Sequence, residues 1–121
     1  MTWQYSQSTG RLTWNGRQVG TGYSGAGDNG KNNPRMESVE DVGPIPRGRY
    51  RIGASQKHPT KGPITMSLSP DGHAAHGRTH FLIHGDSIAH PGAASQGCVI
   101  LSRDIRSRIS ESGDTTLEVV E

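Results

Sequence analysis

The sequence has few of the features that stabilise small secreted proteins or carry proteins into membranes. Of its 121 residues, 30% are apolar, 5% are aromatic and only one is cysteine. A single cysteine excludes an internal disulfide. No apolar run approaches membrane-spanning length, and residues 1–5 lack the basic and then apolar stretches of a secretory signal. We therefore expect a protein that is made in the cytoplasm without a signal peptide and does not insert into membranes.

Charge of one sign is also scarce. Thirteen Lys and Arg against eleven Asp and Glu leave a formal net charge of +2, without a polybasic run. Proteins that follow a nucleic-acid backbone cluster their cations, so nucleic acid is not an expected partner. What the sequence does have is glycine, at 17 positions, which favours turns and short extended segments. The length suits one compact domain, and we predict a single mainly β domain over 1–121.

Apolar and polar residues alternate at 3–5 and again at 12–14. Asn15-Gly16, between Trp14 and Val19, is a strong hairpin signal. The chain therefore opens with a predicted β-meander. Residues 20–46 are rich in Gly, Asn, Asp and Pro, which predicts a long loop. Its apolar side chains indicate an ordered cover rather than a flexible linker.

Further strands are predicted at 49–52, 64–68, 81–83, 99–101 and 117–120. A turn is expected at 69–72, since Ser-Pro-Asp-Gly is a turn sequence. Ser102 can cap one short helix near the C-terminus, which carries Ile105 and Ile109 on one face and ends at Gly113.

Cys98 and His84 are the residues best suited to chemistry. A thiol attacks a carbonyl as a thiolate, so it needs a base or a positive neighbour and a donor for the oxyanion. His84 ends one apolar strand and Cys98 precedes another. Main-chain N–H groups around Gly97 and Cys98 can supply the oxyanion donor. Papain-like enzymes place the cysteine before the histidine. No histidine follows Cys98 here, which argues against that class of enzyme.

Several roles near this pair stay open. His90 is an alternative base, because its loop could fold back beside the thiol. Asp86, Ser87 or a main-chain carbonyl could orient the His84 imidazole. Ser95 is either a catalytic helper or a turn-forming residue.

Four histidines, at 73, 76, 80 and 84, would share one face of a helix and could suggest zinc. Glycines interrupt that helix and residues 81–83 predict a strand, so we expect no metal site. Tyr23, Asn32 and Asn33 in the long loop could contact a substrate or only form turns.

At these positions the sequence resembles a known family. Ile83-His84-Gly85 followed by Ser95-x-Gly97-Cys98-Val99 is similar to the active-site signature of L,D-transpeptidase catalytic domains. The segment 42–53, with Pro-x-Gly-x-Tyr at 46–50, is similar to the stretch that precedes their core. Segments 3–12, 20–25 and 30–34 resemble one branch, the small L,D-transpeptidase-like toxins delivered by type VI secretion. The resemblance covers roughly residues 3 to 103.

The resemblance implies a mostly antiparallel β fold and an enzyme without metal or organic cofactor. Its substrate would be a peptidoglycan stem tetrapeptide, attacked between diaminopimelate and D-alanine through a Cys98 thioester. Water would give the carboxypeptidase outcome and an amine the transpeptidase outcome. It also implies action in the periplasm of a target cell after specialised secretion, with a secretion-machine carrier and an immunity protein as partners. The alternative function is a non-catalytic peptidoglycan-binding module of the same fold.

The sequence departs from the family pattern beside the nucleophile. Family members often have a second histidine where Gln96 stands and an arginine where Ile100 stands. Arg103 could supply the missing charge. We expect Arg103, Gly85 and Tyr23 to contact the substrate, and the departures leave open whether hydrolysis or transpeptidation dominates.

Overall fold

The computed structural model describes residues 2–121, and its fold is mainly β. The strands are β1 (Trp3–Ser6), β2 (Arg11–Trp14), β3 (Arg17–Thr21), β4 (Tyr23–Ser24), β5 (Gly48–Ile52), β6 (Gln56–His58), β7 (Gly62–Asp71), β8 (Phe81–His84), β9 (Val99–Ile100) and β10 (Thr116–Val120). The helices are α1 (Gly27–Gly30) and α2 (Arg103–Ser112), with 3₁₀ turns at Pro34–Met36 and Ala75–Gly77.

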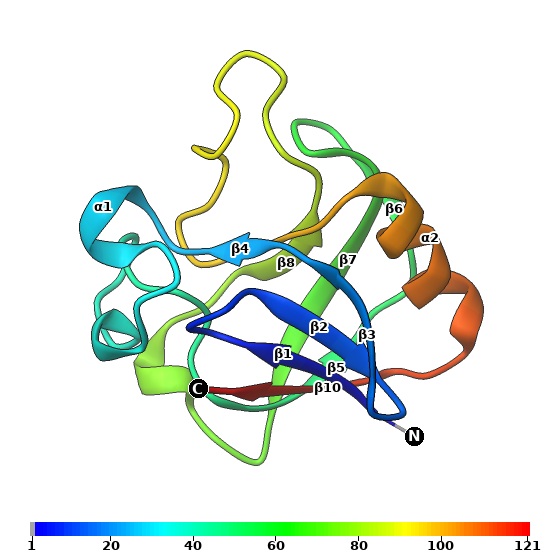
Figure 1. Cartoon of the computed structure of the whole chain (residues 1–121), viewed down its shortest axis with the longest axis horizontal. Helices are drawn as coiled ribbons and strands as arrows, with labels where there is room; N and C mark the ends of the chain where they lie inside the picture. The colour runs from blue at the N-terminus through cyan, green and yellow to red at the C-terminus, as the bar shows by residue number, and fades with distance from the viewer. Residues whose placement is uncertain (1) are drawn as a thin grey trace.

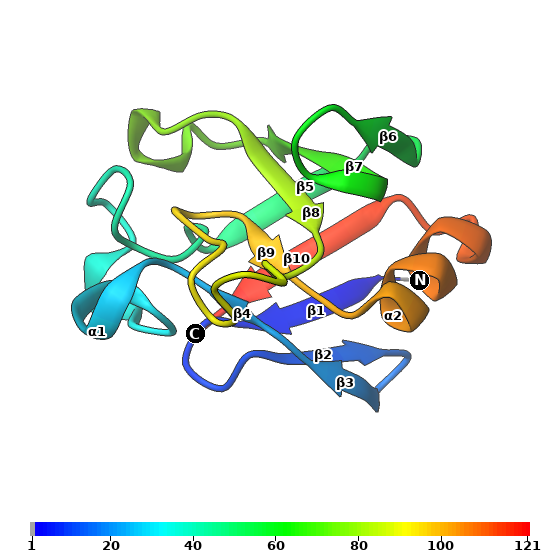
Figure 2. The ribbon, with the colours of Figure 1, turned by 90° about the horizontal axis from the view of Figure 1, so that it is seen from above.

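One sheet joins these strands in the order β3-β2-β1-β10-β5-β7-β8-β9-β4, and β6 pairs with β7 outside this path. The two ends of the path, β3 and β4, are separated in sequence by Gly22 alone. Because one residue spans only about 3.8 Å between neighbouring Cα atoms, the sheet must curl until its ends meet. Figures 1 and 2 show the resulting barrel-like arrangement, with β5, β7 and β8 opposite β1 to β3.

Gly22 is required at this closure. A Cβ atom there would lie 2.0 Å from the main-chain oxygen of Ile100 and 2.7 Å from the Leu101 side chain. Real side-chain carbons do not approach backbone so closely, so only glycine lets β3 continue into β4 beside β9. The segment predicted as a loop therefore contains the seam of the sheet.

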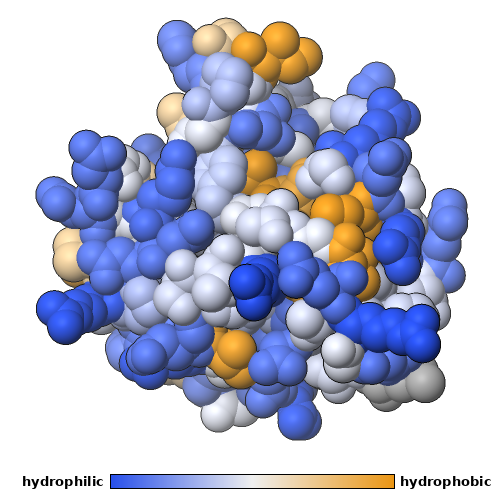
Figure 3. Space-filling view, in the orientation of Figure 1, coloured by the Kyte–Doolittle hydropathy of each residue, from blue (hydrophilic) through white to orange (hydrophobic). Residues whose placement is uncertain are grey.

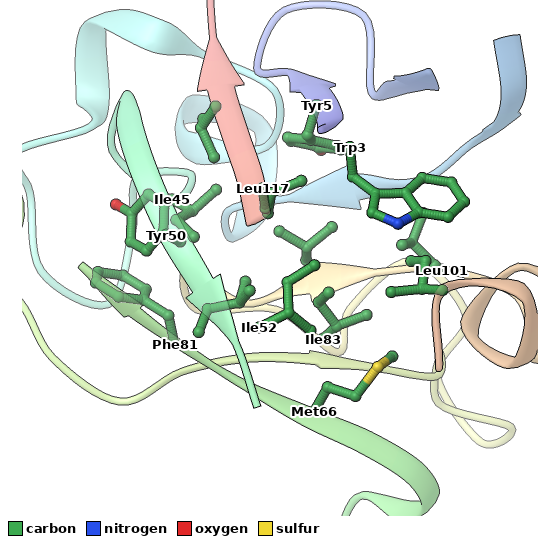
Figure 4. Packing of buried hydrophobic residues seen from close by; sticks show 14 of the residues in the cluster. Trp3, Tyr5, Ile45, Tyr50, Ile52, Met66, Phe81, Ile83, Leu101 and Leu117 are labelled. Atoms are coloured by element: carbon green, nitrogen blue, oxygen red, sulfur yellow. The ribbon is translucent and has the colours of Figure 1, made fainter. Parts of the chain in front are cut away.

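Alternating side chains from both halves of the sheet fill the core, as Figure 4 shows. In β1 Trp3 and Tyr5 are buried while Gln4 is exposed, and the same alternation buries Leu117 and Val119 in β10. The Trp3 ring stacks on Trp14 of β2 with a centroid distance of 5.0 Å. The predicted opening meander is confirmed, and Asn15 and Gly16 at its hairpin both have positive φ.

Helix α2 forms as its sequence predicts. The Ser102 hydroxyl accepts a hydrogen bond from the Ile105 N–H, and Gly113 ends the helix in a left-handed conformation at φ 73°. Ile109 is buried in the core and Ile105 packs against it. The helix is thereby fixed against β7, at one end of the site described below.

Two sequence predictions need correction. The turn predicted at 69–72 is wrong, because β7 continues to Asp71 and only Gly72 turns, at φ 83°. Pro70 is tolerated because β7 pairs there with β5 alone, β8 having ended its pairing at Leu68, and proline suits a strand position whose N–H needs no partner. The segment 20–46 is ordered as predicted, but with short elements, β4, α1 and a 3₁₀ turn.

Among residues 2–121 there is no helix with the length and apolar character that a membrane crossing requires.

Candidate active site

Strand pairing brings Cys98 and His84 to one face of the sheet. β8 and β9 are parallel neighbours, with Ile83 opposite Val99 and His84 opposite Ile100. Side chains alternate along each strand, so Ile83 and Val99 point into the core, while Cys98 and His84 point the other way and line a cleft. The two side chains are therefore within reach of a shared substrate.

The His84 imidazole is held in one orientation by a main-chain carbonyl. Its Nδ1 lies 2.8 Å from the Gly85 oxygen, so Nδ1 carries the hydrogen and donates it. Nε2 is buried without a hydrogen-bond partner within the described chain. That nitrogen is left as an acceptor, in a residue that lines the cleft. Of the alternatives predicted for orienting this imidazole, the structure places the carbonyl there and not Asp86 or Ser87.

Cys98 sits half-buried at the start of β9, and its thiol lies 3.8 Å from the His80 main-chain oxygen. Burial raises the pKa of the Cys98 thiol, and the Leu82 amide, Lys61 and Arg78 only partly offset this. Burial likewise lowers the pKa of His84, and Lys61 and Arg106 lower it further.

Both residues are therefore neutral near pH 7. The cysteine holds its proton because its pKa is raised, and the imidazole is unprotonated because its pKa is lowered. This pair differs from a resting thiolate–imidazolium ion pair. The arrangement suits general-base catalysis, in which His84 takes the thiol proton as the sulfur attacks.

Ser95 and Gly97 shape the turn before the nucleophile. The Ser95 hydroxyl donates to the Cys98 carbonyl at 2.6 Å and accepts from the N–H groups of Gly25 and Gly97 at 2.9 and 3.1 Å. These contacts show the turn-forming role of Ser95, one of the two roles that the sequence left open for it. They also engage the Gly97 N–H, which the sequence predicts as an oxyanion donor, in a hydrogen bond to Ser95. Of the two N–H groups predicted to bind the oxyanion, that of Cys98 remains as the candidate donor.

A large cleft runs past this pair. It has a volume of about 1300 Å³ and is bordered by the segment after β8, the β6–β7 turn and the start of α2. In Figure 1 the segment after β8 extends from the body of the molecule as the yellow loop. Figure 3 shows apolar atoms at the tip of that loop, where Ile88 is fully exposed, and more in the middle of the same face among polar groups.

Tyr23 holds this loop in place. Its hydroxyl donates to Asp86 at 2.6 Å and accepts from the Ala94 N–H at 2.9 Å, and Lys31 lies 4.5 Å from its ring centroid. Burial and the Asp86 carboxylate raise the pKa of Tyr23 to about 12. Tyr23 lines the cleft as predicted for a substrate contact, yet its hydroxyl is used to close the loop.

Asn32 and Asn33 form turns. The Asn32 side chain accepts from the Ser24 N–H, and Asn33 caps the 3₁₀ turn by accepting from the Arg35 N–H. Of the two roles that the sequence left open for them, the structure shows the turn-forming one.

The remaining histidines are dispersed. His90 lies in the exposed part of the loop, outside the cleft lining. His73 contacts the Arg49 carbonyl and His76 contacts the Glu37 carboxylate. Neither histidine lines the cleft with His84. In residues 2–121 no three His, Cys, Asp or Glu side chains are placed to hold a metal ion.

Gly85 and Arg103, both predicted to contact substrate, line the His84 end of the cleft. A Cβ atom at Gly85 would lie 2.7 Å from the Arg106 guanidinium, so a side chain there would have to displace the end of the Arg106 side chain. Arg103 opens α2 with an exposed side chain. Arg106, one turn later, is buried and was not predicted from the sequence.

Arg78 is a second buried arginine that sequence reasoning missed. Its guanidinium donates to the carbonyls of Glu37 and Pro44 at 2.6 and 2.8 Å, and to those of Gly43 and Gln96 at 3.1 and 3.2 Å. It thus joins the segment after α1 to the turn that carries Cys98. No local pattern marks Gly77-Arg78-Thr79 for this role, because all four acceptors are distant in sequence.

Arg78→Met is expected to lower both the stability of the fold and the reactivity of the Cys98 thiol. Four carbonyls lose their donor, three of them on the buried residues Glu37, Gly43 and Pro44, which costs at least about 2 kcal/mol of unfolding free energy. Loss of the nearby positive charge raises the Cys98 pKa further, since Arg78 lowers it in the native protein. Iodoacetamide should therefore alkylate Cys98 more slowly at each pH between about 7 and 9.

Arg78→Lys separates the two effects. A lysine keeps the positive charge but cannot reach four carbonyls at once. The alkylation profile should then stay near that of the native protein while the unfolding temperature still falls. An unchanged profile in folded Arg78→Met protein would show that the arginine charge does not reach the thiol.

Comparison with known proteins assigns the chain to a family. The sequence profile of the Tlde1 domain matches residues 18–119. Solved structures with a similar fold include L,D-transpeptidase 1 of Mycobacterium tuberculosis, with a TM-score of 0.55 and 14% identity over 99% of this chain and 61% of that one. An L,D-transpeptidase of Mycobacterium smegmatis has a TM-score of 0.50 and 15% sequence identity, and the match covers 99% of this chain and 58% of that one.

The chain spans about three fifths of the length of these two mycobacterial structures. Their identity to this chain is low, so they establish the fold. No curated protein gives a significant match. The profile match covers most of the chain, and the predicted mainly β, L,D-transpeptidase-like fold is confirmed. The chain therefore belongs to the Tlde1 domain family, the type VI secretion L,D-transpeptidase effector family.

Proposed function

We propose that this protein is a cysteine enzyme that cleaves peptidoglycan stem tetrapeptides between diaminopimelate and D-alanine. The observation that carries the proposal is the pairing of β8 with β9, which brings Cys98 and His84 into the lining of one cleft, with the imidazole oriented and its Nε2 unpartnered among the described residues. Family membership supports a peptidoglycan-modifying, L,D-transpeptidase-like activity.

The first half of the reaction forms a thioester. Cys98 Sγ attacks the diaminopimelate carbonyl while its proton passes to His84 Nε2, and the negative charge moves onto the carbonyl oxygen. In this proposal the Cys98 N–H binds that oxyanion. As the intermediate collapses, the C–N bond breaks, and D-alanine leaves as an amine after taking the proton from His84.

The second half decides the product. A water molecule gives its proton to His84 and adds to the thioester, and the thiolate leaves and recovers that proton, so a tripeptide carboxylate is released. The amine of a D-amino acid can replace the water and yields an exchanged stem. Both outcomes use the same two side chains, and the wide cleft accommodates either acceptor.

Membership of a type VI effector family supports a place of action and partners for this chemistry. The protein would be delivered by a secretion machine with its carrier to the periplasm of a target bacterium, where stem peptides are exposed. An immunity protein would protect the producing cell. Periplasmic expression of the chain alone should then lyse or deform cells, whereas cytoplasmic expression should not.

The test of the proposed activity is product mass. Purified tetrapeptide muropeptides are incubated with the protein in H₂¹⁸O, with and without added D-methionine. We expect loss of one alanine unit with ¹⁸O in the new carboxylate, or replacement of alanine by methionine, and a transient acyl adduct on the intact protein. Cleavage of another bond would contradict the proposal. Binding without any product would instead support a non-catalytic peptidoglycan-binding module.

A further inference from the structure

Three cationic side chains surround the His84 end of the cleft. Lys61 lies in the turn between β6 and β7, and Arg103 and Arg106 lie one turn apart on α2. All three line the cleft together with His84 and Gly85. They come from two elements that Arg106 ties together, since its Nη1 donates to the carbonyl of Pro63.

Arg106 keeps one donor edge unused. Its Nε donates to the Leu101 carbonyl at 3.1 Å, and its Nη1 donates to the carbonyls of Pro63 and Ile64 at 2.7 and 3.1 Å. No hydrogen bond is found for Nη2 within residues 2–121, although the residue is only 7% exposed. Nη2 is also the atom that lies against Gly85. This edge of the guanidinium has no acceptor among the described residues, and Arg106 lines the cleft.

The three cations of this group are not matched by carboxylates at ion-pair distance in residues 2–121. In the described part of the chain, none of Lys61, Arg103 and Arg106 takes part in an ion pair. Burial lowers the pKa of Arg106, and the repulsion from Arg103 adds to this. Lys61 and Arg106 similarly disfavour a proton on His84. An anion bound between these cations would relieve each of these repulsions.

The chemistry indicates which anion belongs there. His84 must lie beside the nitrogen of the bond that breaks, because it protonates the leaving amine. In a D-amino acid, that nitrogen and the carboxylate are attached to the same carbon. The carboxylate of the leaving or entering D-amino acid must therefore lie a few ångströms from His84, on the side away from the carbonyl that Cys98 attacks.

We propose that Lys61, Arg103 and Arg106 form a carboxylate-binding site for the D-amino acid that leaves or enters the reaction. The inference rests on the proposed function for the position of the scissile bond. From the structure, it is carried by the unpartnered Nη2 of Arg106 and by the lack of an ion pair at Lys61, Arg103 and Arg106 within the described residues. The site selects substrates that end in a free carboxylate, and it places the leaving amine beside His84.

The test compares two substrates on the same protein. Stem tetrapeptides ending in D-alanine and in D-alaninamide differ only in this carboxylate. We expect the native protein to prefer the free acid. The double variant Lys61→Ala, Arg103→Ala should lower kcat/KM for the acid by about 10- to 100-fold, because charge-assisted hydrogen bonds are lost. The acid-to-amide ratio should fall towards one.

The ratio makes this experiment specific. Both substrates use the same thiol and imidazole, so any effect of Lys61 on the pKa values of Cys98 and His84 cancels. Matched controls are Lys57→Ala and Arg108→Ala, which remove exposed cations outside the cleft and should leave the ratio unchanged. No preference for the acid in the native protein, or an equal loss on both substrates, would overturn the carboxylate site.

A binding measurement separates this site from the proposed activity. N-acetyl-D-alanine and its amide are titrated into Cys98→Ala protein and followed by NMR chemical shifts. Binding of the acid alone, weakened by the added double substitution, supports the site even if no turnover is detected. Equal binding of the two ligands, or no binding of either, contradicts it. Arg106 is left intact in these variants because it also holds three main-chain carbonyls.

Discussion

A Cys98→Ala protein is expected to release no D-alanine from stem tetrapeptides and to form no acyl adduct. The sulfur atom supplies the bond that carries the stem between the two half-reactions, and no other cysteine exists in the chain. Knocking out the nucleophile of a hydrolase that uses a comparable proton-transfer system costs about 10⁶-fold in kcat. We expect a loss of at least about 10⁴-fold, measured as D-alanine released per protein molecule.

The substitution should leave the fold intact, which makes its result interpretable. The thiol is half-buried, and its contacts with the main chain, the His80 carbonyl at 3.8 Å and the Leu82 amide, are weak sulfur hydrogen bonds. Ser95 still orders the turn, since it binds the main chain of residue 98 and not the side chain. The unfolding temperature should fall by only a few degrees. Native-like product formation by this variant would exclude the thioester mechanism.

The elements that the sequence predicted correctly are those whose signal is local. Alternation in β1 and β10 and the cap of α2 at Ser102 depend on residues within a few positions of one another, and each prediction is confirmed. The order of strands in the sheet has no such signal. The closure at Gly22 depends on Ile100 and Leu101, almost eighty residues away, so it could not be read from the sequence.

The same difference between local and long-range signals explains which residues of the candidate site could be predicted. The sequence could single out Cys98 and His84 as candidates because each adjoins a short apolar strand in a recognisable motif. Ser95 and Gly97 belong to that motif too, but their roles depend on where the turn points its amides, and the structure directs the Gly97 N–H to Ser95. Arg78 bonds to carbonyls that are up to 41 residues away, and such contacts leave no pattern around the arginine itself.

His84→Gln is expected to lower kcat by about 10² to 10⁴-fold, the usual contribution of a positioned base. The glutamine amide can still donate to the Gly85 carbonyl, so the site keeps its packing while the acceptor nitrogen is lost. His90→Ala is the matched control, because that histidine lies in the exposed loop outside the cleft. A large loss in His90→Ala with little loss in His84→Gln would make His90 the base.

The pH dependence distinguishes a base from a structural histidine. The pKa of His84 is lowered by burial, so the native protein should keep its neutral, active imidazole below the pH at which an exposed histidine is half protonated. As pH falls through the His84 pKa, kcat/KM should fall. In His84→Gln this acidic limb should disappear. Its residual rate should instead rise about tenfold per pH unit, because only the thiolate can attack, and the pKa of Cys98 is raised.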